Sequence, residues 1–341
     1  MTSTLIPPPA RTTPRRVVKE PLTRRQRLSR FDLKASPYLY IAPFFVLFAL
    51  TGLFPLVYTL VVSLHDWQLL QGQGDFVGLA NFTEVLQDRY FWNSIGNTLS
   101  IFVLSSVPQL IVALVLAAVL DQNLRAKSFW RMSVLLPYVV SPVAVALIFS
   151  SVFGEQSGLV NNLLGVVGIE PIEWKNDTLA SHVAIATMVN WRWTGYNALI
   201  LLAAMQAVPR DLHEAAAIDG AGAVRRFFSV TLPGIRPTFV FVMITATIGG
   251  LQIFAEPRLF DVSTAGGIGG SERQFQTSVL YLWEMAFFRQ DFGKAAAIAW
   301  LLFLLIVGIG LINFLLSQRI ASAEKAVGSR RERRRSKGAR R

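Results

Sequence analysis

Residues 214–233 read EAAAIDGAGAVRRFFSVTLP, and the organisation of the whole chain can be read outward from this segment. Asp211 and Glu214, three residues apart, have the spacing of a capping box, which predicts the start of a helix. Gly220 is a natural stop for that helix. A second amphipathic turn follows and ends at Pro233, before a long apolar run. The segment therefore predicts two short helices joined at a glycine, between two apolar stretches.

The composition is that of a membrane protein. Of 341 residues, 52% are hydrophobic and only 16% are charged, whereas soluble domains carry about 25% charged residues. The chain has no cysteine, which excludes disulfides, thiol catalysis and thiolate metal sites. The net charge is +12, with lysine and arginine crowded into both ends. Such basic blocks bind nucleic acid in some proteins, but beside transmembrane segments they fix orientation, so we expect a membrane lipid environment and no nucleic acid partner.

Six apolar stretches approach the ~20 residues that a helix needs to cross a bilayer. The sequence thus predicts an all-α polytopic membrane protein with six transmembrane helices. The fifth is the least regular, because Gly249 and Gly250 weaken its helix and a Glu256-Pro257-Arg258 stretch interrupts its end. The predicted spans are Tyr38–Leu64, Ile95–Leu120, Val134–Phe153, Leu179–Ala204, Phe239–Phe254 and Ala295–Leu316.

The distribution of basic residues predicts the orientation of these spans. If the N-terminus is cytoplasmic, most of the 33 lysine and arginine residues fall on the inner side, as the positive-inside rule requires. Both termini and the loop 209–233 are then cytoplasmic. We expect a basic, disordered cytoplasmic tail over residues 1–36, a transmembrane domain over 37–318 and a second basic cytoplasmic tail over 319–341.

The segment 214–233 resembles the EAA loop of permease subunits in ABC importers. The order Glu-Ala-Ala, three residues, Gly, nine residues, then a β-branched residue, any residue and Leu-Pro is present, with Val230 where that family more often has Ile. The resemblance implies that the loop docks into a cleft of a separate ATPase. The alternative is an amphipathic helical hairpin on the lipid surface. The residues that the resemblance assigns to ATPase coupling are Glu214, Ala215, Ala216, Asp219, Gly220, Ala221, Leu232 and Pro233.

Other segments resemble the permeases of carbohydrate importers in particular. These are the Gly-Leu-x-Asn-Phe element at residues 78–82, Asn97-Thr98, and residues 249–257, which are most similar to the subset that handles di- and oligosaccharides. The resemblance covers residues 38–318 and implies the type I importer fold in a bacterial cell membrane. It further implies a second EAA-type permease subunit, an ABC ATPase dimer and an extracytoplasmic sugar-binding protein as partners.

No enzyme motif accompanies these features. The sequence contains neither GxGxxG nor GxxxxGK[ST], the patterns that cradle nucleotide phosphates. The histidines His65, His182 and His213 are isolated and give no metal-ligand spacing, so we expect neither a metal site nor a catalytic residue. We expect no cofactor in this chain, with ATP and magnesium bound by the partner ATPase.

Polar residues inside the predicted spans are candidates for the substrate path, because charge in a membrane is costly. Arg192 lies about 20 Å along the fourth span, counting ~1.5 Å per residue. Its aromatic neighbours would stack on sugar rings and its polar neighbours would donate to hydroxyls; alternatively, the cluster anchors the membrane interface or holds a neighbouring helix. Gln252 and Glu256 are four residues apart and share one face of the outer half of the fifth span; alternatively, Glu256 is a helix-end partner of Arg258. The candidates are Asn190, Trp191, Arg192, Trp193, Tyr196, Asn197, Gln252 and Glu256.

Three functions are considered from the residues, and the third, a membrane enzyme or scaffold, lacks any reactive constellation in the sequence. The first is a permease subunit that moves carbohydrate by alternating access, driven by ATP hydrolysis in another chain. The second is an ion-coupled secondary transporter of a small polar solute. The second function favours acidic residues in several spans and inverted repeats, and the sequence has neither.

Overall fold

The computed structural model describes residues 24–261 and 268–338, so the predicted tails at 1–23 and 339–341 lie outside the described residues. The chain divides into two compact units at Tyr58/Thr59. In the first unit, residues 24–36 belong to a helix, which corrects the prediction of a disordered tail there. Pro55 follows a π-helical turn, as expected where an extra residue relaxes the helix ladder before a proline. The elements are α1 (Arg24–Phe48), η1 (Ala49–Leu53) and α2 (Phe54–Ser63), the last of which continues into the second unit.

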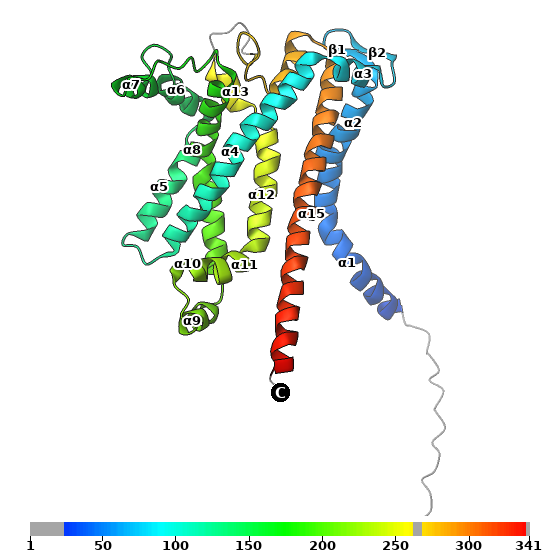
Figure 1. Cartoon of the computed structure of the whole chain (residues 1–341). Coiled ribbons are helices and arrows are strands. Elements are labelled where there is room, and N and C mark those ends of the chain that lie inside the picture. Colours follow the sequence, from blue (N-terminus) through cyan, green and yellow to red (C-terminus); the bar gives the residue numbers. More distant parts are fainter. Residues whose placement is uncertain (1–23, 262–267, 339–341) are drawn as a thin grey trace, which may run out of the picture. The chain divides into compact units, whose positions relative to one another are not determined.

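The second unit, from residue 59 onward, is built from helices, and its described residues include only one antiparallel pair of short strands. Long helices run between two ends of the unit, with α9 to α11 at one end and the strands at the other (Figure 1). The elements are β1 (His65–Gln68), β2 (Gly72–Phe76), α3 (Ala80–Gln87), α4 (Arg89–Asp121), α5 (Lys127–Val139), α6 (Pro142–Val152), α7 (Leu159–Val166), α8 (Thr178–Gln206), α9 (Arg210–Ile218), α10 (Ala223–Arg226), η2 (Phe227–Thr231), α11 (Leu232–Gly234), α12 (Arg236–Leu251), α13 (Ala255–Phe260), α14 (Ser278–Trp283), η3 (Glu284–Phe288) and α15 (Phe292–Gly338).

The helices support membrane crossing, although not as six uniform spans. Among the described residues, three helices are long and apolar enough to cross a bilayer by themselves: Ala35–Ser63, Arg89–Asp121 and Phe292–Leu315. Two sharply bent helix pairs raise this number to five if each pair is one span. The predicted fourth span corresponds to α8, which has 29 residues and a length of about 43 Å, but its polar side chains keep it outside this apolar set.

The predicted third span is wrong as a single helix, because it bends by 90° between α5 and α6. Val140 is extended, and the Ser141 hydroxyl accepts a hydrogen bond from the Ala144 amide at 3.2 Å, as an N-cap. Pro142 then occupies the first turn of α6, where its missing N–H leaves no partner unsatisfied. The Ser-Pro pair therefore ends one helix and begins another.

The predicted fifth span is shorter than expected. α12 ends at Leu251, Gln252 has φ −102° and ψ 17°, and a new helix begins only at Ala255. Gln252 and Glu256 therefore do not share a helix face, and this prediction is wrong. At its other end, α12 meets the preceding helical segment with a 72° bend.

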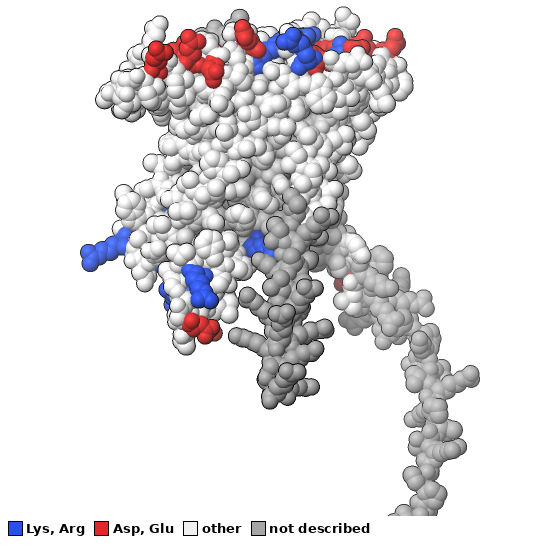
Figure 2. Space-filling view, in the orientation of Figure 1, with Lys and Arg blue, Asp and Glu red and all other residues white. Residues whose placement is uncertain are grey.

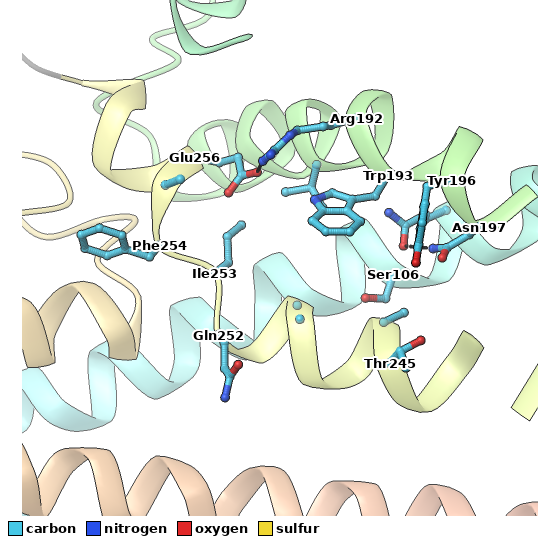
Figure 3. A pocket seen from close by; sticks show the side chains of 16 residues that line it. Ser106, Arg192, Trp193, Tyr196, Asn197, Thr245, Gln252, Ile253, Phe254 and Glu256 are labelled. Carbon is cyan, nitrogen blue, oxygen red and sulfur yellow. Dashed lines mark hydrogen bonds and ion pairs between the residues drawn. The ribbon is translucent and has the colours of Figure 1, made fainter. Parts of the chain in front are cut away.

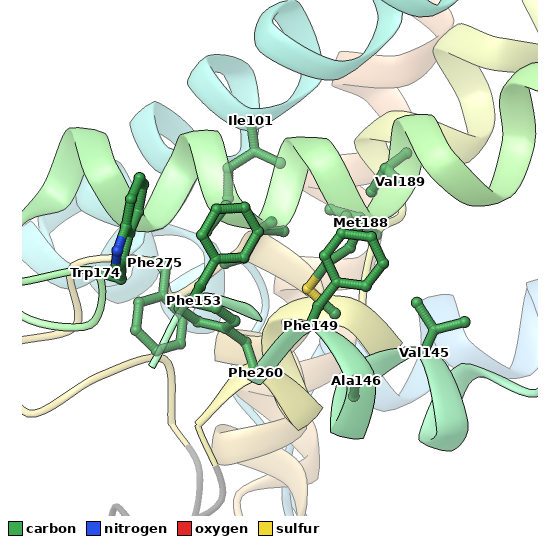
Figure 4. Close-up of a cluster of buried hydrophobic side chains, with 13 residues drawn as sticks. Ile101, Val145, Ala146, Phe149, Phe153, Trp174, Met188, Val189, Phe260 and Phe275 are labelled. Carbon is green, nitrogen blue, oxygen red and sulfur yellow. The ribbon is translucent and has the colours of Figure 1, made fainter. Parts of the chain in front are cut away.

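The core of the second unit lies around α8, which packs against α4 and α5. Gly195 permits the contact with α5, because a Cβ at this position would lie 1.7 Å from the Val134 carbonyl oxygen. A second part of the core joins α6, α8 and α13 through aromatic side chains (Figure 4). Phe149, Phe153 and Trp174 are buried there together with Met188. Beyond the sharp bend, α6 is thus held by apolar packing against α13 and α8.

The end that carries the strands is fastened by buried polar contacts. Glu284 accepts hydrogen bonds from Arg273 at 2.7 Å, from Gln276 at 2.7 Å and from Arg289. Tyr281 donates to the carboxylate of Asp88, and burial together with this carboxylate raises the pKa of the Tyr281 hydroxyl. The tyrosine therefore stays protonated as a donor at all physiological pH values.

Charged side chains gather at the two ends of the second unit, and an uncharged band separates them on the visible face (Figure 2). An uncharged band between two polar ends is the surface that a bilayer selects. One of these ends contains α9, and acidic and basic side chains lie close together there (Figures 1 and 2). The loop 209–233 therefore lies outside the band.

Candidate functional site

A cavity of about 370 Å³ opens where α12 is interrupted, between α4, α8, α12 and α13. Its lining combines aromatic rings, uncharged polar groups and one pair of opposite charges (Figure 3). The lining residues are Ser106, Gln109, Val189, Arg192, Trp193, Tyr196, Asn197, Thr245, Ala246, Gly249, Gly250, Gln252, Ile253, Phe254, Ala255 and Glu256.

The chemistry of the cavity is concentrated on one face of α8. Arg192, Trp193, Tyr196 and Asn197 recur at the spacing of one helical face, and all four line the cavity. Tyr196 stacks on Tyr138 of α5 at a ring distance of 4.8 Å, and Trp193 meets Tyr138 edge-on at 5.2 Å. The aromatic rings are thus held by one another before any ligand arrives.

The charged pair of the cavity joins α8 to α13. Arg192 Nη1 donates to Glu256 Oε1 at 3.1 Å, and the two side chains are 17% and 8% exposed. Arg258, the alternative partner predicted for Glu256, instead stacks over the Trp283 ring at 4.6 Å; the prediction of a Glu256–Arg258 pair is wrong. The reason is the helix break at residues 252–254, which turns Glu256 toward α8.

Three of the predicted path residues do not point toward the centre of the cavity. Asn190 and Trp191 lie on another face of α8, where they line a second and more open hollow with Thr187 and Gly195. The Trp191 ring packs edge-on against Phe149 at 5.7 Å. Gln252 lies at the break, but its exposed side chain points away from the α8 residues (Figure 3). The cavity is therefore lined by six of the eight predicted residues, although the Gln252 side chain points away from the α8 residues, and Asn190 and Trp191 line the other hollow.

Several lining residues were not among the candidates predicted from the sequence. Ser106 and Gln109 of α4 are buried, and Asn197 Nδ2 donates to Gln109 Oε1 at 3.2 Å. Thr245 lies on α12. Polar residues at positions 105, 106 and 109 within an otherwise apolar span were a usable signal, because a polar stripe on a membrane helix marks a face turned from lipid.

A close helix contact beside the break shapes the cavity wall. A Cβ on Gly250 would lie 2.7 Å from Phe102 Cδ2 and 3.2 Å from Ser106 Oγ. Glycine at this position therefore lets α12 approach α4 closely, as small residues do between membrane helices.

The loop 209–233 forms two short helical pieces, as the sequence predicts, although its helix start differs. Pro209 is the N-cap of α9 and makes no side-chain cap, and Asp211 already lies in the first turn. The predicted capping box is therefore wrong. At the other end, Gly220 has φ +76°, and the Ala221 amide donates to the Ala216 carbonyl at 2.9 Å. This arrangement is a Schellman motif, in which glycine accommodates the left-handed residue.

Large apolar side chains are exposed on this loop. Ile218 is 87% exposed and Val224 is 73% exposed, with Leu212 and Phe228 also on the surface. Of the residues predicted to couple to an ATPase, Ala216, Ala221 and Leu232 are half-buried, whereas Glu214, Ala215, Asp219, Gly220 and Pro233 are exposed.

No group of three or more His, Cys, Asp or Glu side chains that could hold a metal ion occurs within residues 24–261 and 268–338. Two of the histidines make structural hydrogen bonds instead. His182 bonds Ser100 Oγ at 2.8 Å and the Gln274 carbonyl at 2.9 Å, and His65 bonds the Val61 carbonyl. These contacts join neighbouring segments of the second unit.

Comparisons with known proteins agree with this architecture. Residues 97–322 match the family described as binding-protein-dependent transport system inner membrane component. The chain is 35% identical over 299 residues to the lactose transport system permease protein LacF of Rhizobium radiobacter, covering 86% of this chain and 97% of that protein. It is 32% identical over 275 residues to the trehalose/maltose transport system permease protein MalF of Thermococcus litoralis, covering 81% and 91%.

A solved structure shows the same fold at low sequence identity. A chain of the bacterial alginate ABC transporter, crystallised with an alginate pentasaccharide-bound periplasmic protein, superposes with a TM-score of 0.70 at 20% identity, covering 86% of this chain and 97% of that one. The chain therefore belongs to the binding-protein-dependent transport system inner membrane components, the permeases of ABC sugar importers.

Proposed function

We propose that this chain moves a di- or oligosaccharide through the membrane by way of the cavity between α8 and the break in α12. The observation that carries the proposal is the lining: three aromatic rings, Trp193, Tyr196 and Phe254, share the cavity with hydroxyl and amide groups. Family membership favours this function over the ion-coupled secondary transporter, and the names of the lactose and trehalose/maltose relatives support a glycan as the cargo.

The lining suits a carbohydrate for physical reasons. A sugar ring has an apolar face, which an aromatic ring covers with large area and little loss of side-chain freedom. Its hydroxyls need partners once they leave water, because an unpaired buried polar group costs about 1–3 kcal/mol. Ser106, Thr245 and the Asn197–Gln109 pair offer such partners without adding net charge.

The energy for transport is proposed to come from another chain. The loop 209–233 would dock in a cleft of an ABC ATPase dimer, which would bind ATP and magnesium, and a second EAA-type permease would complete the pathway. The exposed Ile218 and Val224 support this role, since apolar side chains on a polar end of a membrane protein favour a protein contact. A sugar-binding protein would deliver cargo at the opposite end, at β1, β2 and α3.

Replacing Trp193 by alanine should raise the sugar concentration for half-maximal uptake by at least about tenfold, since a buried aromatic anchor is worth about 2 kcal/mol or more. The measurement is uptake of labelled sugar by the assembled importer in proteoliposomes, over a panel of disaccharides. The matched control is Trp191→Ala, two residues away on α8, where the side chain lines the second hollow instead of the cavity. Equal effects of the two substitutions would contradict the assignment of the cavity.

The proposed cytoplasmic position of the loop predicts a labelling pattern. The chain contains no cysteine, so single-cysteine variants can be labelled without a background. Ser229→Cys in the loop should react with a membrane-impermeant maleimide only after cells are opened. Gln71→Cys, between β1 and β2 at the opposite end, should react in intact spheroplasts. The reverse pattern would place the loop outside and would exclude its contact with a cytoplasmic ATPase.

A further inference from the structure

The cavity contains two ionised side chains, and they neutralise one another. Among the residues that the structure describes, Arg192 and Glu256 are the only charged ones in its lining, and their 3.1 Å contact joins opposite signs. The other polar lining groups are hydroxyls and amides. The cavity as a whole is therefore neutral, although it contains a cation well able to bind an anion.

Glu256 occupies only part of the guanidinium. The contact uses Nη1 of Arg192, whereas its Nε is buried and has no hydrogen-bond partner among the described residues. An arginine that meets a planar anion tends to use two of its N–H groups together. Arg192 thus retains one unpaired buried donor, while its charge is balanced by Glu256.

The surroundings keep the pair from rearranging freely. The guanidinium lies 5.6 Å from the centre of the Trp193 ring, and Glu256 is fixed on α13 beside buried Pro257 and Phe260. A ligand carboxylate or sulfate would meet the Glu256 carboxylate in a site with little water. Like charges brought together in such a place are strongly unfavourable.

We propose that the Arg192–Glu256 pair sets the charge selectivity of the cavity: Glu256 masks Arg192, so that uncharged glycosides bind and anionic ones are rejected. This inference rests on the proposed function of the cavity as a saccharide site. It also assigns opposite roles to the two partners. Arg192 alone would attract an anionic sugar, and Glu256 prevents this.

The test compares two ligands that differ only at C6. These are 4-nitrophenyl β-D-glucopyranoside, with a hydroxymethyl group, and 4-nitrophenyl β-D-glucuronide, with a carboxylate. Binding to the full chain in lipid nanodiscs is measured by equilibrium dialysis, with the nitrophenyl absorbance as the signal and empty nanodiscs as the blank. The wild-type chain should bind the glucuronide at least about tenfold more weakly than the glucoside, as like-charge contact requires.

The variant Glu256→Gln should abolish this preference. Glutamine keeps the shape and an oxygen for Arg192 but removes the negative charge, so glucuronide affinity should rise by at least about tenfold while glucoside affinity changes little. The double variant Arg192→Gln/Glu256→Gln restores a neutral cavity and should lose the gain. Asp261→Asn, which alters an acidic residue paired with Lys175 away from the cavity, should leave the preference of the wild type.

The outcomes separate the two proposals. Equal binding of both glycosides to the wild type, or a gain that persists in the double variant, would overturn the charge selectivity and leave the saccharide cavity standing. Binding of neither glycoside to the wild type or any variant would overturn the cavity as a saccharide site, and the selectivity with it. If Glu256→Gln fails to accumulate in the membrane, the tenfold preference of the wild type still decides the inference.

Discussion

Replacing Gly195 by valine should prevent the chain from reaching a stable folded state in the membrane. α8 approaches α5 so closely at this residue that even a methyl group would lie 1.7 Å from the Val134 carbonyl oxygen and 2.7 Å from its carbonyl carbon. These are backbone atoms of a helix, so they cannot rotate aside as a side chain would. Overpacking of this kind costs about 1–3 kcal/mol and sometimes more, and valine adds further methyl groups to the same contact.

The measurement is the thermal midpoint of the detergent-solubilised full chain, followed by fluorescence-detected size exclusion, together with the yield in membranes. Gly195→Ala should already lower the midpoint by several degrees. The matched control is Gly96→Ala in α4, where a Cβ would meet nothing within 4 Å and where alanine improves the helix by about 1 kcal/mol. An unchanged midpoint for Gly195→Ala would mean that α5 and α8 do not pack at this distance.

Replacing Gly220 by valine should stop coupled transport while the chain still inserts and folds. Gly220 has φ +76°, a region that costs other residues about 1–2 kcal/mol and that β-branched residues almost never enter. The substitution therefore reshapes the turn between α9 and α10 without touching the buried helices. If this loop transmits ATP-driven motion, uptake should fall by about tenfold or more, on the scale of typical coupling energies of about 1–3 kcal/mol.

Two further variants sharpen this test. Gly222→Val places the same side chain two residues away, where φ is −64° and a Cβ would meet nothing within 4 Å, so transport should stay close to normal. Glu214→Lys leaves the backbone unchanged but reverses an exposed charge, and it should also uncouple ATP hydrolysis from uptake. Normal uptake by both Gly220→Val and Glu214→Lys, in chains that purify with the ATPase, would remove the coupling role from this loop.

The sequence predicted the helical class, the membrane-like composition and the turn at Gly220 because these depend on local properties. Apolar runs of bilayer length and a glycine after a helix can be recognised from adjacent residues.

The interruptions within the predicted spans were harder to predict from the sequence. The sequence predicted one continuous third span, whereas the chain bends by 90° between α5 and α6. Beyond the bend, Phe149 and Phe153 pack with residues that are distant in sequence, such as Met188 of α8 and Phe260 of α13.

The residues of the candidate site also divide into those that the sequence predicted and those that it did not. Its α8 residues were identified because a charge beside aromatic rings in an apolar segment is conspicuous in sequence. Thr245 was not identified, because a lone hydroxyl in a span also donates to a carbonyl of its own helix, as Thr245 does to that of Phe241. The partner of Glu256 was missed because the nearest arginine in sequence, Arg258, turns toward Trp283 once the helix is broken at residues 252–254.

The sequence by itself determined that this chain is a helical permease of the importer family, and it located the exposed loop at residues 209–233. Apolar runs and spaced motifs lie within short stretches of sequence, so they can be recognised without knowledge of how the helices pack. Only the tertiary structure decided that residues 64 positions apart, Arg192 and Glu256, form an ion pair at 3.1 Å in a neutral cavity. Helix breaks and close glycine contacts set which side chains meet, and those contacts depend on the whole fold.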